Sequence, residues 1–399
     1  MHYNCVFCFL SSKAATFAQN VPMKYNIILF SAALALSACQ TESTQSASIE
    51  SKNATENTSD NKISAESSNV ELNAIASFLG GNQPKSAGDY STAFANSEWK
   101  NHQSLLNNAW SKALVEKVVP MRDWSKTEKI ERKSQTLFYP FSGADFLHVY
   151  SAHSDYTSYY LFGLEPAGEI PKKENILNPA LTSNVLSTIY KSVDENMSQS
   201  FFHTKYMAVE FNNPVLKGTI PVFMFFMNRM GVELTSIKPI TFNDKGEIVD
   251  AKDFSKGVRI GFIDGGKNKE LYYFSGDISD TGLKDTPGLK NMINSISKDA
   301  TTMMKSASYL CHLPDFSGVR DMILANSFTI MQDDTGIPFR FYDQNKWKIQ
   351  HYGIYTQPIP LFASRGQADL RAAVVGKEKP IKFRYGYNNP PNLMVAIKK

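Results

Sequence analysis

Residues 136–164 read TLFYPFSGADFLHVYSAHSDYTSYYLFGL and carry the clearest structural signal in the chain. Three runs in this stretch are rich in aromatic and β-branched residues and have the length of strands: Thr136–Tyr139, Phe146–Ala152 and Thr157–Leu164. The polar turn His153-Ser154-Asp155 separates the last two runs. We therefore expect those two runs to form an antiparallel hairpin.

Strands and helices are also expected on both sides of this stretch. A helix with one apolar face should end at Pro120, and a second, short helix is predicted over Lys126–Arg132. Further helices are predicted at Leu177–Val193, Ile220–Met230, Pro287–Ile296 and Asp315–Asn326. Further strands are predicted at Val232–Phe242, Val258–Phe262, Leu271–Phe274, Ser306–Cys311, Ser327–Gln332, Phe339–Tyr342, Trp347–Tyr355, Ile381–Tyr385 and Leu393–Ile397. Because strands cluster without a regular alternation with helices, the predicted fold is α+β, with a largely antiparallel mixed sheet flanked by helices.

The composition excludes several classes of protein. The 399 residues include 42 Lys and Arg against 38 Asp and Glu, so the formal net charge is only +4 and gives no sign of nucleic-acid binding. Four cysteines are too few for a disulfide scaffold, and no second cysteine pair has the spacing of a structural zinc site. The patterns G-x-S-x-G, G-x-x-x-x-G-K-[ST] and H-E-x-x-H are absent from the globular part. The sequence therefore predicts no cofactor and no metal.

The N-terminal region has the order of a secretion signal. Met23-Lys24 supplies a positive start, and the apolar run Tyr25–Leu34 is shorter than the roughly 20 residues that span a bilayer. The run leads to Leu36-Ser37-Ala38-Cys39, and polar sequence follows at once. A buried cysteine after an apolar run is the alternative interpretation of Cys39. The order of a lysine, an apolar run, a small residue and a cysteine favours a cleaved leader, with Met23 as the true start of translation.

Residues 36–39 resemble the lipobox of bacterial lipoproteins at each of its four positions. The resemblance implies that Cys39 carries the lipid and becomes the first residue of the mature protein. It also implies that residues 1–38 are removed, which takes away two lysines and no acid and leaves a net charge of +2. Gln40 follows in place of the aspartate that retains lipoproteins in the inner membrane of enteric bacteria. The outer membrane, facing the periplasm, is therefore the expected location.

The mature chain divides into a tether and a body. Residues 39–69 are dominated by Ser, Thr, Asn and Gln, a composition that cannot bury enough apolar surface to offset the entropy of ordering. We predict a flexible, disordered tether there. Residues 70–399 form the globular body, as one large α+β domain or as two closely joined lobes.

Two neighbourhoods are candidates for acid–base chemistry. Asp145 and His148, with His153 and Asp155 close by, form the densest group of histidines and carboxylates. The alternative is that these are ordinary polar residues at strand ends and in a turn. The second neighbourhood contains His312, Asp315 and Arg320 and follows Cys311, which we interpret as a core thiol because catalytic Cys/His pairs are rarely adjacent in sequence.

Candidate ligand-binding residues lie in the C-terminal third. Asp333 and Asp334 begin an Asp-Asp-Thr-Gly segment that is typical of a turn and whose carboxylates could hold a hard cation. Tyr385 and Tyr387 lie in an aromatic loop whose rings could stack on sugars, although aromatic residues more often fill a β-rich core. Residues 332–341 and 383–387 resemble a region shared by uncharacterised bacterial lipoproteins, which implies a class but no mechanism.

The sequence as a whole predicts a lipoprotein attached to the bilayer through Cys39, with a body that serves as a binding or structural module of the envelope. Peptidoglycan or another envelope protein is the expected partner. The alternative is an envelope hydrolase that acts on glycan or peptide with an Asp/His site.

Overall fold

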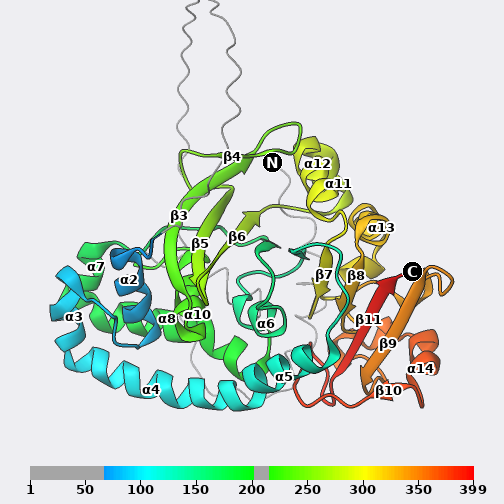
Figure 1. The fold of residues 1–399 in the computed structure, drawn as a ribbon, viewed down its shortest axis with the longest axis horizontal. Helices are drawn as coiled ribbons and strands as arrows, with labels where there is room; N and C mark the ends of the chain where they lie inside the picture. The colour runs from blue at the N-terminus through cyan, green and yellow to red at the C-terminus, as the bar shows by residue number, and fades with distance from the viewer. Residues whose placement is uncertain (1–66, 202–214) are drawn as a thin grey trace, which may run out of the picture. The chain divides into compact units, whose positions relative to one another are not determined.

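The computed structural model describes residues 67–201 and 215–399, and these fall within one compact unit, Ile63–Lys399. The predicted leader, Cys39 and nearly all of the predicted tether lie outside the described residues. The fold is α+β, as predicted, with a mixed sheet of 11 strands flanked by helices. Figure 1 shows this arrangement, with β3 and β5 towards one side of the sheet and β9 and β11 towards the other.

Figure 1 labels the strands β3 to β11. The strands are β1 Thr136–Tyr139, β2 Ser158–Gly163, β3 Glu233–Phe242, β4 Ile248–Asp250, β5 Gly257–Asp264, β6 Lys267–Ser275, β7 Thr301–Met304, β8 Thr329–Gln332, β9 Trp347–Gly353, β10 Glu378–Lys379 and β11 Asn392–Lys398. Their order across the sheet is β10-β9-β11-β8-β7-β1-β2-β6-β5-β3-β4. The short strands β10 and β4 form its two edges.

The described helices cover both faces of the sheet. They are α2 Val70–Gly80, α3 Ser91–Ala95, α4 Ser97–Ala113, α5 Val119–Glu128, α6 Phe146–Ala152, α7 Lys173–Leu177, α8 Pro179–Gln199, α10 Ile220–Met230, α11 Asp280–Asp285, α12 Pro287–Ile296, α13 Ser317–Asn326 and α14 Ala368–Val374. None of the helices in the described ranges has the length and apolar character needed to cross a membrane.

Alternate residues of the strands enter two different cores. Leu137 and Tyr139 of β1 pack with the buried faces of α2, α4, α5, α6, α8 and α10. Phe138, between them, packs on the opposite face with residues of α11, α12, α13 and α14. This alternation follows from the period of two along a strand. The centre of the sheet is therefore buried on both faces.

The centre of the sheet is parallel, which the hairpin prediction did not anticipate. Strands β8, β7, β1, β2 and β6 are parallel neighbours, and antiparallel strands lie on either side of them. The predicted hairpin is wrong because Phe146–Ala152 is the helix α6, which crosses over from β1 to the parallel β2. Asp145 begins this helix, since its side chain accepts a hydrogen bond from the backbone N–H of His148.

Five other predicted elements are also wrong. Residues 306–311 form a tight turn and the start of a 3₁₀ helix, because the strand β7 ends earlier, at Met304. Phe339–Phe341 is a 3₁₀ turn, and residues 381–385 form no strand. Pro120 does not end a helix and the separate helix over Lys126–Arg132 does not exist, because a π-helical turn, Leu114–Val118, leads directly into α5 with Pro120 in its first turn.

Candidate functional site

The carboxyl ends of β1, β7 and β8 meet at one edge of the parallel centre. The strand order reverses between β1 and β7, because the chain leaves β1 for β2 on one side and later adds β7 on the other. In open sheets with parallel strands, ligands bind outside the carboxyl ends at such a reversal. Asp145, Lys305 and Asp333 follow β1, β7 and β8 and lie at this edge. These three residues are therefore candidates for a ligand-binding site.

Asp145 is the centre of a buried hydrogen-bond network. Its Oδ1 accepts from His148 Nδ1 at 2.7 Å and from Asn196 Nδ2 at 3.0 Å. Its Oδ2 lies 3.0 Å from Lys305 Nζ and accepts from the Tyr139 hydroxyl at 3.1 Å. Asp145 and Lys305 are each 2% exposed, and His148 is completely buried. A carboxylate with this many donors is fixed in position.

The surroundings set the charges of this network. Burial by itself raises the pKa of Asp145, but the neighbouring cation Lys305 and the hydrogen-bond donors outweigh burial and hold the pKa well below its usual range. Burial lowers the pKa of His148 to about 4, and the charges of Lys305 and Lys117 act in the same direction. At neutral pH His148 is therefore uncharged and donates to Asp145 through Nδ1. Its buried Nε2 has no hydrogen-bond partner.

Lys117 and Lys305 meet at the C-terminal end of α8. Lys117 comes from the π-helical turn and is 4% exposed. Its Nζ donates to the carbonyl of Ser198 at 3.0 Å and to Ser200 Oγ at 2.9 Å. Lys305 Nζ donates to the carbonyl of Ser200. Cations are favoured here, since the last carbonyls of a helix lack partners within the helix.

Arg384 is the third cation of this region. Its guanidinium donates to Gln199 Oε1 at 3.2 Å and to the carbonyl of Tyr387 at 2.7 Å, and it lies over the ring of Phe201. Its buried Nε has no partner. We use the name central polar cluster for Lys117, Asp145, His148, Asn196, Ser200, Lys305, Ser306 and Arg384.

The backbone is strained around the same cluster. Among the described residues, six that are not glycine have a positive φ, and four of them are Ser200, Ser306, Ser308 and Tyr309. Such conformations are costly and concentrate at functional sites. The Ser306 N–H donates to Asp333 Oδ2 at 3.1 Å, while the buried Ser306 hydroxyl has no partner. The turn after β7 is thus held by β8, and one hydroxyl group remains without a partner.

The Asp333 and Asp334 carboxylates are already occupied by protein donors. Asp333 accepts from Ser306 and Thr335, and Asp334 accepts from Tyr309, Asn388 and Asn392. Burial and the neighbouring Asp334 raise the pKa of Asp333 to about 7. A Cβ on Gly386, which has φ +80°, would lie 1.7 Å from Asp333 Oδ2. The pair therefore ties β8 to the turn after β7 and to the C-terminal loop.

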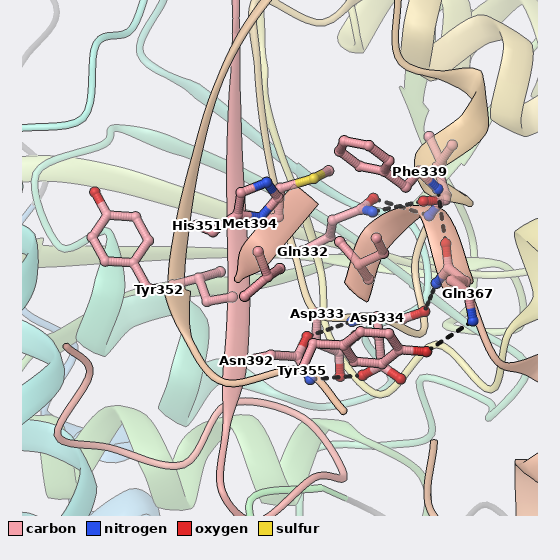
Figure 2. A pocket seen from close by; sticks show the side chains of 14 residues that line it. Gln332, Asp333, Asp334, Phe339, His351, Tyr352, Tyr355, Gln367, Asn392 and Met394 are labelled. Atoms are coloured by element: carbon pink, nitrogen blue, oxygen red, sulfur yellow. Dashed lines mark hydrogen bonds between the residues drawn. The ribbon is translucent and has the colours of Figure 1, made fainter. Parts of the chain in front are cut away.

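A small cavity lies beside Asp333 and Asp334 (Figure 2). Gln367 closes one side of it, because its Nε2 donates to the Asp334 carbonyl at 2.9 Å and its Oε1 accepts from the Phe339 N–H at 2.8 Å. The enclosed space is about 10 Å³. That is roughly the room for one water molecule. This cavity does not accommodate a substrate.

A larger hollow of about 400 Å³ lies between α4 and α8. It is lined by Glu98, Asn101, His102, Leu105, Ser183, Leu186, Ser187, Tyr190 and Lys191. Neither this hollow nor the small cavity includes Asp145 or His148.

The structure brings together one of the two predicted acid–base groups. Asp145 and His148 contact each other, whereas Asp155 pairs with Arg132 at the surface and His153 caps the end of α6. His312, Asp315 and Arg320 are not joined by any hydrogen bond or ion pair within the described ranges.

The residues of the second group have separate surroundings. His312 packs against Tyr309, and Asp315 is exposed. Arg320 pairs with Asp321 and lies over Phe341. Cys311 is completely buried, and burial raises the pKa of its thiol to about 12.

The two candidate tyrosines differ in position. Tyr385 is completely buried in the core, so its ring is not offered to a sugar. Tyr387 is half-buried and packs edge-on against Phe201 at 4.8 Å and stacks on Phe362 at 5.7 Å. Its hydroxyl donates to the carbonyl of Ser306 at 2.9 Å.

Six members of the cluster were not predicted from the sequence: Lys117, Asn196, Ser200, Lys305, Ser306 and Arg384. Only Lys305 had a local signal, as a charge directly after the apolar residues Met303 and Met304. Comparison of the chain with protein-family models, with curated proteins and with solved structures finds no match.

Proposed function

We propose that the protein is a lipid-anchored lipoprotein of the cell envelope, held in the outer membrane by Cys39, whose body binds an envelope component. The observation that supports a binding role is the central polar cluster. It combines buried charges, a strained backbone and unpartnered polar atoms at the reversal of the strand order. The lipobox-like residues 36–39 support the anchor.

The anchor is tested by metabolic labelling with a fatty acid and by mass spectrometry of the mature N-terminus. We expect label on the wild-type chain and none on the Cys39→Ser variant. A mature N-terminus upstream of Cys39, without acyl groups, would contradict the proposal.

The binding role is tested with the full-length protein and isolated peptidoglycan sacculi, which sediment on centrifugation. We expect the wild-type protein to sediment with the sacculi without releasing soluble fragments. Arg384→Gln should reduce the sedimenting fraction, while Lys382→Gln, which removes an exposed charge two residues away, should not. Failure of the wild-type protein to sediment would contradict peptidoglycan as the partner.

The alternative function is an envelope hydrolase, and one observation favours it. Asp145 orients His148 through Nδ1 and leaves Nε2 free, which is the arrangement of a histidine that acts as a general base. The same sacculus experiment separates the two functions. Release of soluble glycan or peptide fragments that is lost in His148→Gln would support the hydrolase and contradict a purely binding role.

A further inference from the structure

The central polar cluster contains more cations than anions. Lys117, Lys305 and Arg384 carry positive charge, and Asp145 is the only member with a negative charge. His148 is uncharged at neutral pH. The nearby Asp333 accepts from Ser306 and Thr335 and contacts none of the three cations. An excess of buried positive charge is costly unless a counter-charge is supplied.

The end of α8 compensates only part of this excess. The carbonyls of Ser198 and Ser200 accept hydrogen bonds from Lys117 and Lys305. A helix C-terminus is equivalent to about half a negative charge. Together with Asp145 it offsets about one and a half of three positive charges. More than one positive charge therefore has no counter-charge within the cluster, and Glu116, which follows Val115 in the π-helical turn, is an anion outside the cluster whose charge acts on Lys117.

The three cations also repel one another. Burial, together with the charges of Arg384 and Lys305, lowers the pKa of Lys117 to about 8. A bound anion would relieve both the repulsion and the cost of burial.

Two hydrogen-bond donors remain without acceptors at the cluster. They are Arg384 Nε and the Ser306 hydroxyl, which are both buried. Buried donors in native proteins nearly always have a partner, so each unpaired donor calls for an explanation.

Arg384 marks the accessible side of the cluster. It is half-buried, whereas Lys117, Lys305 and Asp145 are almost fully enclosed. Its guanidinium lies 5.5 Å from the ring centre of Phe201, which contacts Tyr387.

We infer that the central polar cluster binds an oxyanion, a carboxylate or phosphate group of the ligand, through Arg384, Lys117 and Ser306. This inference rests on the proposed binding function and specifies the chemistry of the ligand. Carboxylate and phosphate share the feature that the cluster recognises, namely negatively charged oxygens that accept from guanidinium, ammonium and hydroxyl groups.

The test measures the thermal stability of the full-length protein in detergent with sodium phosphate or sodium acetate, with sodium chloride holding the ionic strength constant. A ligand that binds the folded state raises the melting temperature in a saturable manner. We expect a saturable rise with at least one of the two anions, and the more effective anion identifies the group. No saturable rise with either anion would overturn the inference.

Variants locate the site. Arg384→Gln should weaken anion binding about tenfold or more, because it removes a charge-assisted hydrogen bond. Lys382→Gln should leave the affinity unchanged. Lys117→Met supplies a second variant if Arg384→Gln does not fold, and it should also weaken anion binding. Equal affinities in Arg384→Gln, Lys117→Met and Lys382→Gln would overturn the inference.

The outcome is separable from that of the proposed function. If the wild-type protein sediments with sacculi but no anion stabilises it, the binding role stands and the oxyanion site fails. If phosphate or acetate binds through Arg384 but sacculi do not retain the protein, the oxyanion site stands and the partner lies elsewhere in the envelope.

Discussion

Asp145 accepts hydrogen bonds from Tyr139, His148 and Asn196, and it is the anion that neutralises Lys305. Asp145→Asn removes this charge and leaves Lys305 buried. We expect the free energy of unfolding to fall by about 3–5 kcal/mol, as measured by denaturant titration. Asp155→Asn breaks the surface pair with Arg132 and should cost less than about 1 kcal/mol.

A second substitution tests whether the loss comes from the unpaired lysine. In the Asp145→Asn background, Lys305→Met removes the buried positive charge and should recover part of the lost stability. The decrease in the free energy of unfolding of the double variant should be smaller than the sum of the decreases in the two single variants. A decrease equal to that sum would show that Asp145 and Lys305 do not interact as described.

Cys311 should be chemically inert in the folded protein. The thiol is completely buried and its pKa is raised to about 12, so almost no thiolate forms at pH 8. We expect iodoacetamide to leave Cys311 unmodified in the native protein and to alkylate it fully in denaturant, as read by mass spectrometry. Alkylation of native Cys311 at the rate of a free thiol would contradict this expectation.

At the scale of elements, the end of α5 offers a clear substitution. Lys129 caps this helix in the left-handed conformation with φ +46°, and its side chain is exposed. Lys129→Gly relieves the strain and should raise the free energy of unfolding by up to about 1 kcal/mol. Lys126→Gly makes the same exchange inside the helix and should lower it by a similar amount. If both substitutions raise the free energy of unfolding, or both lower it, the assignment of Lys129 as the cap is contradicted.

The helix α6 explains why the centre of the sheet was not predicted. Phe146–Ala152 has the composition of a strand, and all seven residues are buried, so no polar face reveals a helical period. The helix depends on the cap that Asp145 provides and on tertiary packing, in which Phe146 stacks on Tyr150 at 4.8 Å. The sequence nevertheless identifies Asp145 and His148 as candidates for acid–base chemistry. The helix brings their side chains together, because residues three apart lie on the same face.

Elements with clear boundaries were predicted accurately. Ile220–Met230 and Pro287–Ile296 are helices with the predicted ends, since each has a proline within its first two residues that sets the first turn. The strand predicted at residues 306–311 failed because the true strand, β7, lies earlier in the chain, begins with two threonines and is only four residues long. Short strands of this kind are stabilised by their neighbours in the sheet and leave little local signal.

At the scale of the whole molecule, buried histidines link stability to pH. Burial lowers the pKa of five histidines to about 4: His102, His148, His153, His312 and His351. The unfolded chain binds protons at these groups near pH 6.5, so stability is present above pH 6.5 and is lost as the pH falls towards 4. Asp333 acts in the opposite direction, because its pKa is raised and the folded state keeps its proton.

We therefore expect the free energy of unfolding to be lower at pH 5 than at pH 7.5, with each completely buried histidine contributing on the order of 2 kcal/mol. Urea titrations at the two pH values check this result. His153→Gln should reduce the difference, since one buried histidine is removed. Equal or greater stability at pH 5 would contradict this expectation. It would show that carboxyl groups with a raised pKa, such as Asp333, outweigh the histidines in the pH dependence of stability.

The cluster as a whole could not be predicted from the sequence, because its members come from segments far apart in the chain. Lys117, Asp145, Ser200 and Lys305 meet only after β1 and β7 pair and α8 packs on the sheet. Local patterns identify single residues, whereas this site depends on the topology of the parallel centre.

The two edges of the sheet have a consequence for a protein confined to a surface. A lipid anchor would concentrate the molecules in two dimensions, where exposed edge strands tend to join into continuous sheets. Here the edges are β10, with two residues, both charged, and β4, with three residues. Such short edges offer few unpaired backbone groups to a neighbour. Crowding on a membrane should therefore not drive this fold to polymerise edge to edge.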